Sequence, residues 1–365
     1  MPFFKFDNIK ISGIASAVPK TVVNIDSFKN EFGEEVVNKF KKMTGVESYR
    51  KTSIKQTASD LGYEAAEKLL LEKRLNREDI KLLIFVAHSS DYWRPATACV
   101  LHKRLNLSSD CAAIDINLGC SAVIYGLQTA CSMMLSSDIE QALVIVGETM
   151  TKMVNQKDKS TVMLFGDGGG ALLLEKIENN SHIEGVLKSD GNRFNSIIAP
   201  AGGFRNRFAI KDDFICEDGN IRSLYDVNMN GTDVFSFSIS DVPETIQELF
   251  EKTKTTVNDY DCFAFHQANA FIHKQLLKRF KIPVEKAPLS IHKYGNTSAA
   301  SIPLTLCDCY GEINDNSEIN VLMCGFGVGL SWGALNVKLN KNDIFSVVET
   351  DSFFEEGFFN SPDDI

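Results

Sequence analysis

Short apolar runs alternate along the chain with stretches in which apolar residues recur at helical spacing. The runs Leu82–Ala87 and Ala142–Val146 have the length and the Val, Ile and Leu content of buried strands. Residues 60–75 instead place their apolar positions on one helical face, namely Leu61, Ala65, Leu69 and Leu70. Thr57 and Asp60 are spaced for a capping box at the start of that helix. The alternation predicts an α/β fold.

Three features recur in the same order at a nearly constant offset. They are a polar turn and apolar strand that end in histidine, a glycine that precedes a helix of small residues, and a second apolar strand. They lie at 76–88 and 257–266, at 119–121 and 295–297, and at 141–147 and 318–325. The pattern predicts two similar halves about a pseudo-two-fold axis, with sites where the halves meet. Chance recurrence of short strands is the alternative.

Composition narrows the class of protein. Of the 365 residues, 44% are hydrophobic and 24% are charged, which is typical of a soluble globular chain. The net charge of −10 argues against nucleic-acid binding. The longest apolar runs fall short of the ~18 residues that a membrane span needs, and the N-terminus has no pattern of a secretory signal. We therefore expect a cytoplasmic protein with no membrane span.

Nine cysteines are scattered through the chain without a CxxC pair, which favours reduced and mostly buried thiols. No His or Cys partners stand at ligand spacing, so we expect no metal site. After about residue 340 the composition changes to acids mixed with Phe. This tail is either a docking segment or disordered.

Candidate chemistry begins at Cys120, which stands between a strand and a helix of small residues. A helix N-terminus favours the thiolate form of a cysteine, as a nucleophile requires. His266 ends an apolar strand, and Asn296 precedes a second helix of small residues. Both side chains can donate a hydrogen bond to a developing oxyanion, and His can also shuttle a proton. Each residue alone could be structural: a buried cysteine, a core histidine and an N-cap asparagine.

Five ordered motifs resemble the β-ketoacyl-acyl carrier protein synthase III family. They are DINLGCSA at 115–122, FGDGGGALLL at 165–174, FHQAN at 265–269, YGNTSAASIP at 294–303 and GFGVGLSWG at 325–333. The resemblance implies a thiolase fold with duplicated βαβαβαββ halves in a five-layered αβαβα arrangement, and a homodimer. It places an N-terminal half with the nucleophile at 1–178, a C-terminal half with His and Asn at 179–340, and the tail at 341–365.

The resemblance also implies a mechanism. Cys120 takes an acyl group from a thioester of coenzyme A or acyl carrier protein, with oxyanion support from the backbone N–H groups of Cys120 and Val328. His266 and Asn296 then stabilise the enolate formed when a malonyl thioester loses carbon dioxide, and this carbanion attacks the acyl group. Phe326 favours release of carbon dioxide. No bound cofactor is implied.

Two glycine-rich runs could suggest other chemistry. The run Gly166–Ala171 passes a dinucleotide-binding pattern, but the next residues read as a strand. Without a following helix, no helix dipole awaits a pyrophosphate, and these glycines are better explained by close packing. Thiolases carry a second catalytic cysteine, whose position here is Gly325 rather than Cys324. Thiolase chemistry is therefore disfavoured.

Several positions depart from the family pattern. Lys39 and Met43 stand where the family has Trp and Arg that hold the adenine of coenzyme A, so we expect a carrier-protein donor or a differently held coenzyme. Basic residues that could still bind a phosphate, or could be solvated surface lysines, remain at Lys41, Lys42 and Lys152. Arg94 stands where the family has an apolar residue that reaches across the dimer interface. It could meet a polar acyl group or pair with Asp91.

The remaining candidate residues are those that could contact the substrate or dock the acyl carrier protein. Thr232 and Phe235 are further possible substrate contacts. Phe271 replaces the usual carrier-docking Arg, and basic residues that follow it could form a displaced docking patch, namely Lys274, Lys278 and Arg279.

The leading interpretation is a decarboxylating condensing enzyme in a specialised fatty acid, polyketide or acyl-decoration pathway. One alternative is an acyltransferase of the same fold that acts on an oxygen or nitrogen nucleophile. A chalcone-synthase-like enzyme is disfavoured by FHQAN and by Trp332-Gly333. From a different class, a non-catalytic partner subunit of a condensing heterodimer is disfavoured by the intact Cys120, His266 and Asn296.

Overall fold

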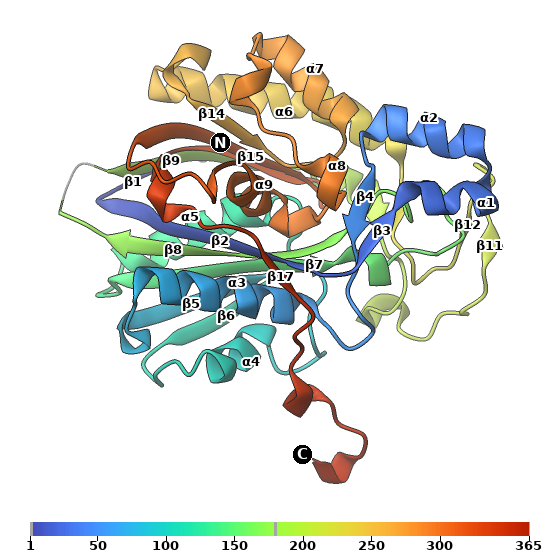
Figure 1. Cartoon of the computed structure of the whole chain (residues 1–365), viewed down its shortest axis with the longest axis horizontal. Helices are drawn as coiled ribbons and strands as arrows, with labels where there is room; N and C mark the ends of the chain where they lie inside the picture. The colour runs from blue at the N-terminus through green and yellow to red at the C-terminus, as the bar shows by residue number, and fades with distance from the viewer. Residues whose placement is uncertain (1–2, 179–180, 365) are drawn as a thin grey trace.

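The computed structural model describes residues 3–178 and 181–364 and consists of five stacked layers (Figure 1). Two β-sheets face each other across a central helical layer of α5 (Ala122–Leu135) and α9 (Ser301–Tyr310). Helices α3 (Ala58–Lys73) and α4 (Thr97–Arg104) cover the outer face of one sheet. Helices α6 (Gly231–Thr253) and α7 (Ala270–Phe280) cover the other. This is the αβαβα arrangement of the thiolase fold, as predicted.

The two sheets repeat one topology. One has the strand order β17-β2-β8-β7-β5-β6 and the other β1-β9-β16-β15-β14. The stretch β2-β8-β7-β5 matches β9-β16-β15-β14 strand for strand, including a parallel pair at one side and antiparallel pairs at the other. Strand bounds in the first sheet are β2 (Ile9–Pro19), β5 (Ile80–Val86), β6 (Ala112–Ile116), β7 (Gln141–Thr149), β8 (Asp167–Lys176) and β17 (Val348–Thr350). In the second they are β1 (Phe3–Asp7), β9 (His182–Ser189), β14 (Cys262–Phe265), β15 (Glu318–Gly327) and β16 (Ser331–Asn340).

The first and the last strand of the described chain each belong to the sheet of the opposite half. Strand β1 pairs with β9 in the C-terminal sheet, whereas β17 of the tail pairs with β2 in the N-terminal sheet. The predicted division between residues 178 and 179 borders residues 179–180, which lie outside the described residues. The tail packs on the body of the protein, because residues 348–357 make strand and side-chain hydrogen bonds to it, and its role as a docking segment stays a prediction.

Helix α3 begins at Ala58, two residues before the predicted start, and carries the predicted capping box. The backbone N–H of Thr57 donates to the Asp60 carboxylate at 2.7 Å. The helix packs closely against β8, where a Cβ added at Gly169 would come within 2.5 Å of the Leu61 backbone. Glycine at this position therefore permits the close approach. Strand β8 begins at Asp167, directly after Gly166, so no helix follows this glycine run and the packing interpretation is confirmed.

Smaller elements complete the structure, and some of them contribute residues to the cavity described below. They comprise short helices and three two-stranded pairings. Their bounds are α1 (Lys29–Phe32), α2 (Glu34–Thr44), α8 (Ile291–Tyr294), β3 (Val22–Asn24) with β4 (Ser48–Arg50), β10 (Ile197–Ile198) with β13 (Asn228–Met229), and β11 (Phe214–Ile215) with β12 (Ile221–Arg222). The buried Arg222 guanidinium ties this region to the body, since it contacts the Asp158 carboxylate at 2.6 Å.

Within the described part of the chain, no helix has both the length and the apolar character that crossing a bilayer requires. In the same residues, His, Cys, Asp and Glu side chains do not gather into a group of three or more that could hold a metal ion.

Candidate active site

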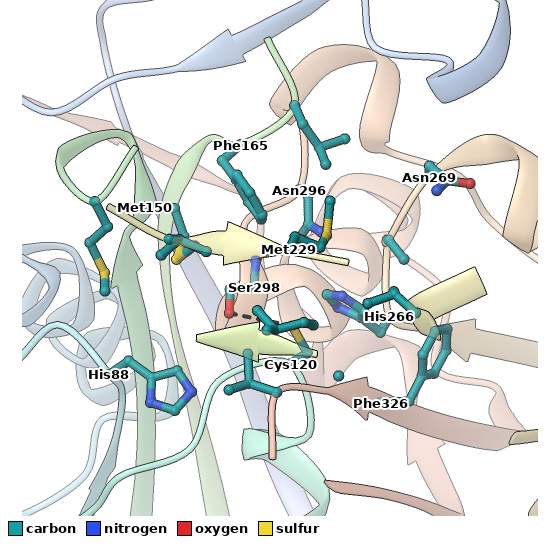
Figure 2. A pocket seen from close by; sticks show the side chains of 18 of the residues that line it. His88, Cys120, Met150, Phe165, Met229, His266, Asn269, Asn296, Ser298 and Phe326 are labelled. Carbon is teal, nitrogen blue, oxygen red and sulfur yellow. Dashed lines mark hydrogen bonds between the residues drawn. The ribbon is translucent and has the colours of Figure 1, made fainter. Parts of the chain in front are cut away.

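A cavity of about 670 Å³ opens between the two halves and is lined by residues of both. Cys120, His266 and Asn296 all reach it, as Figure 2 shows. Its remaining wall is mostly apolar, with Met150, Met153, Met229, Leu164, Phe165 and Phe326 among the lining side chains. An apolar cleft with a few convergent polar groups is typical of a small-molecule site.

Cys120 lies between β6 and α5, two residues ahead of the first helical residue. Its Sγ lies 3.6 Å from the Ser298 hydroxyl. A side chain at Gly327 would lie 2.7 Å from the same sulfur, so glycine is needed there for β15 to pass the thiol. Burial raises the pKa of Cys120 to about 11, against hydrogen bonds from Ser298 and from the backbone of Val328 and Cys120 that favour the thiolate. The expected preference for thiolate is therefore outweighed by desolvation.

His266 follows β14, at the carboxyl end of the strand, as predicted. Its backbone N–H donates to the Cys324 carbonyl at 2.8 Å, and its Nδ1 lies 2.7 Å from the Ser301 hydroxyl. Burial lowers the pKa of His266 to about 3, so the ring is neutral near pH 7. The Phe326 ring stands perpendicular to the imidazole, with 5.4 Å between centroids.

Asn296 is fixed through its backbone and its carbonyl oxygen. Its N–H donates to the Leu164 carbonyl at 2.9 Å, and its Oδ1 accepts from the Ser298 N–H at 2.9 Å. No described residue accepts a hydrogen bond from its Nδ2. The amide therefore presents a donor to the cavity that it lines.

Val328 follows the end of β15 and also lines the cavity. Its backbone contacts the Cys120 thiol, and its carbonyl accepts from the Ser331 hydroxyl at 2.7 Å. The backbone groups of Val328 and Cys120 thus face the sulfur from two loops.

Comparison with known proteins gives one family for the whole chain. Residues 114–191 match the family model 3-oxoacyl-[acyl-carrier-protein] synthase III, and residues 250–339 match the model of its C-terminal part. A β-ketoacyl-[acyl-carrier-protein] synthase III of Clostridium perfringens is 36% identical over 91% of this chain and 100% of its own. The chain belongs to the 3-oxoacyl-[acyl-carrier-protein] synthase III family.

Solved structures agree with that assignment. A 3-oxoacyl-(acyl-carrier protein) synthase from Burkholderia xenovorans superposes with a TM-score of 0.90 at 34% identity, over 96% of this chain and 99% of its own. A priming β-ketosynthase of the R1128 polyketide pathway, 23% identical, shares the fold with a TM-score of 0.77 over 92% of this chain and 97% of its own. This synthase III-like chain is accordingly an acyl-transferring condensing enzyme.

Of the two predicted substrate contacts on α6, one lines the cavity and the other does not. Phe235 lines the cavity and stacks on Phe271 of α7, with 5.5 Å between ring centroids. Thr232 is exposed on the first turn of α6 and does not line the cavity. The prediction for Thr232 therefore gains no support from this geometry.

Arg94 is exposed and does not line the cavity of its own chain. Among the described residues it makes no ion pair, so the alternative pairing with Asp91 is not found; that carboxylate instead accepts from the Ser59 hydroxyl at 2.6 Å. The neighbouring Trp93 does line the cavity. Arg94 therefore does not reach the acyl cavity of its own chain, and its contact with a polar acyl group across a dimer interface stays a prediction.

The Lys152 ammonium donates hydrogen bonds to backbone carbonyls. Its Nζ donates to the carbonyls of Ile54 at 3.0 Å and Gln56 at 2.5 Å, and it lies outside the cavity lining. Phosphate binding by Lys152 thus gains no support. Lys274, Lys278 and Arg279 are exposed on α7, and none of them forms an ion pair with a described residue.

Sequence reasoning did not select His88 or Ser298, which both line the cavity. Ser298 stands within the YGNTS motif and contacts the thiol. For His88 the signal was present, because the repeated strand-then-histidine pattern pairs it with His266. The structure places both after equivalent strands, β5 and β14.

Proposed function

We propose that this enzyme catalyses a decarboxylative Claisen condensation through Cys120, His266 and Asn296, in a specialised fatty acid, polyketide or acyl-decoration pathway. The observation that carries the proposal is the convergence of the three side chains on one cavity, with Nδ2 of Asn296 left as a donor and a neutral His266 beside it. A thiol, a neutral imidazole and a free amide are the groups that acyl transfer followed by enolate chemistry requires.

In the first half-reaction, the Cys120 sulfur attacks the carbonyl carbon of an acyl thioester. The bond from that carbon to the carrier sulfur breaks, and the thiol proton goes to the departing carrier thiolate. The backbone N–H groups of Cys120 and Val328 hold the negative oxygen of the tetrahedral intermediate. This assignment is supported by the hydrogen bonds of both backbone groups to the Cys120 sulfur, which place them beside the acylated atom.

In the second half-reaction, a malonyl thioester places its carbonyl oxygen between His266 and Asn296. We assign the donor role in the 2.7 Å contact between Nδ1 and the Ser301 hydroxyl to the hydroxyl, so that Nε2 of His266 carries the proton that faces this oxygen. The carbon–carboxylate bond breaks, carbon dioxide leaves, and its electron pair forms the enolate. The enolate carbon attacks the acyl carbon, and the Cys120 sulfur leaves and regains a proton. The apolar Phe326 favours neutral carbon dioxide over a carboxylate.

The acyl donor and the malonyl unit are proposed to arrive on acyl carrier protein. Phe271, Lys274 and Lys278 follow one stripe of α7 at helical spacing, and Phe271 lines the cavity. The two lysines are exposed and make no ion pair with described residues, so they are available to an acidic partner. Lys152, one of the three lysines considered for a coenzyme phosphate, is instead bonded to two carbonyls.

A homodimer is proposed from an apolar surface beside the cavity. Four large apolar side chains are exposed there: Trp93 (62%), Phe204 (71%), Phe208 (89%) and Ile210 (66%). The Trp93 ring packs edge-on against the Phe204 ring, with 5.3 Å between their centroids. A cluster of large exposed apolar side chains marks an interaction surface. Since Trp93 also lines the cavity, a second copy seated here would contact the wall of the site.

The deciding experiment measures carbon dioxide release from malonyl-acyl carrier protein by enzyme already loaded with an acyl group. We expect release together with a 3-oxoacyl product, and loss of both in Cys120→Ala. The matched control is Cys99→Ala, which removes an exposed thiol on α4 and should leave the rate unchanged. Acyl transfer to an alcohol or amine without carbon dioxide would support the acyltransferase alternative. No acylation of Cys120 by any thioester would support a non-catalytic subunit.

A further inference from the structure

A second cluster of polar side chains lies at the carboxyl ends of the adjacent strands β7, β5 and β6, on the wall of the same cavity. The buried Glu148 carboxylate accepts the backbone N–H groups of His88 at 2.9 Å and Ser89 at 3.2 Å, and the Ser89 hydroxyl at 2.7 Å. These bonds fix the turn that carries His88 into the cavity wall. The condensation mechanism uses none of these side chains.

The His88 ring is oriented by Asn117. Its Nδ1 lies 2.6 Å from the Asn117 Oδ1, and because an amide oxygen can only accept, Nδ1 carries the proton. In the neutral ring, Nε2 is then the acceptor. This nitrogen is buried and has no hydrogen-bond partner among the described residues. A buried acceptor without a partner is costly, and an unexplained one is a reason to look for a ligand.

The unpaired nitrogen lies close to the nucleophile. A Cβ on Gly119, the residue before Cys120, would be 2.9 Å from His88 Nε2 and 2.9 Å from the Ser298 hydroxyl. The Ser298 hydroxyl is itself 3.6 Å from the Cys120 sulfur. Figure 2 shows Cys120 and Ser298 between His88 on one side and His266 with Phe326 on the other. His88 therefore lies across the thiol from the residues proposed for the enolate.

Adaptable apolar side chains also line this side of the cavity, beside the polar His88, Asn117 and Ser298. Met150 and Met153 line it, and thioether side chains can repack around different acyl chains. A few polar groups among apolar ones set orientation and selectivity in such a cleft, and His88 Nε2 is the one that has no partner among the described residues. We propose that His88 is a specificity-determining residue that hydrogen-bonds a hydroxyl on the acyl chain carried by Cys120, so that the preferred acyl donor is a short hydroxyacyl thioester. This inference rests on the proposed function of Cys120.

The test compares two donors that differ by one hydroxyl, 3-hydroxybutyryl-acyl carrier protein and butyryl-acyl carrier protein. The rate of Cys120 acylation is followed by intact-protein mass spectrometry. We expect the wild-type enzyme to prefer the hydroxyacyl donor by about tenfold, the effect of one buried hydrogen bond and an otherwise unpaired acceptor. His88→Leu should abolish or reverse the preference, and His88→Gln should keep part of it.

Controls separate specificity from folding. His88→Met is a second apolar variant whose flexible side chain suits the methionine-lined wall, and it should behave as His88→Leu does. His292→Leu alters an exposed histidine outside the cavity lining and should leave the preference intact. Equal acylation of the wild type by the two donors would overturn the inference, and so would a preference that survives both apolar variants. No acylation by either donor would instead count against the proposed function.

Discussion

The Tyr92 hydroxyl donates a hydrogen bond of 2.6 Å to the Gly357 carbonyl, and this bond joins the C-terminal tail to the loop that carries Trp93 into the cavity wall. Two further bonds hold the tail on the body: the Gln56 side chain donates to the Ser352 carbonyl at 3.0 Å, and the Phe354 N–H donates to Asp60 at 2.9 Å. The tail thus braces one edge of the acyl site from the outside.

Removal of the tail tests this bracing. We expect a chain that ends at residue 350, and so keeps β17, to remain folded with a lower melting temperature and a higher KM for the acyl donor. Tyr92→Phe removes only the bond to Gly357 and should cost about 0.5–1.5 kcal/mol of stability. Thermal melting and steady-state kinetics measure the two effects. An unchanged KM in the truncated enzyme would show that the tail does not position the loop.

The Cys120 thiol provides a second prediction, in its reaction with iodoacetamide. Because burial raises its pKa to about 11, the alkylation rate should continue to rise between pH 8 and pH 10.5 instead of levelling near the ordinary value of 9. Ser298→Ala removes a donor that stabilises the thiolate, so the pKa should rise further and the rate at pH 8 should fall. Peptide mass spectrometry separates Cys120 from the exposed Cys99 and Cys309. A rate in Ser298→Ala equal to that of the wild type would contradict this role.

Local sequence was sufficient for the features that depend on neighbouring residues. The α3 capping box, the strands at 82–87 and 142–146, and the placement of His266 at a strand end follow from spacing and apolar pattern alone. The rejection of a nucleotide loop at Gly166 followed in the same way, because the strand begins at the next residue. Such features depend on the order of residues within about ten positions of one another.

The features that sequence could not supply depend on contacts between distant segments. Lys152 bonds to carbonyls about a hundred positions earlier in the chain, and these contacts leave no local pattern. The raised pKa of Cys120 has the same origin, because β15 from the other half of the chain buries the thiol. The position of Cys120 before a helix does not reveal that burial. The tail docks through long-range bonds to Gln56 and Tyr92, which its own mixture of acids and Phe does not encode.

Asn296→Ala should separate the two half-reactions. The variant loses the Nδ2 donor proposed for the enolate, so condensation should slow by about 10²–10³-fold while acylation of Cys120 remains near the wild-type rate. Carbon dioxide release reports condensation, and intact mass reports acylation. Asn314→Ala, an exposed asparagine outside the cavity, is the matched control. Equal loss of both half-reactions would mean that Asn296 supports the shape of the site and does not act on one step.

The buried histidines give the enzyme a specific acid sensitivity. Burial lowers the pKa of His273 to about 4 and that of His266 to about 3, both below the value of about 6.5 in an unfolded chain. Below pH 6.5 the unfolded chain binds protons that the folded chain does not, so stability is fully present above that pH and is lost as the pH falls toward 4. Each histidine should contribute a slope of about 1.4 kcal/mol per pH unit in this window.

Denaturant unfolding of His273→Gln between pH 4.5 and 6.5 measures that slope. The variant should depend less steeply on pH than the wild type, by about one proton. His292→Gln, at an exposed position, should leave the slope unchanged. A slope in His273→Gln as steep as that of the wild type would show that His273 does not supply the proton.

The basic stripe of α7 should act on the carrier protein and not on the chemistry. Lys274→Glu together with Lys278→Glu places two acids beside Phe271 at the mouth of the cavity, where an acidic carrier would be repelled. We expect KM for acyl carrier protein thioesters to rise about tenfold or more, with kcat little changed and the effect reduced at high salt because surface charges are screened. Lys252→Glu together with Lys254→Glu, at the exposed end of α6, changes the net charge by the same amount and is the control. A short acyl-pantetheine thioester carries no protein, so its KM should not respond to the α7 charges. An equal rise in KM for this small donor would place the defect inside the cavity and would contradict α7 as the docking surface.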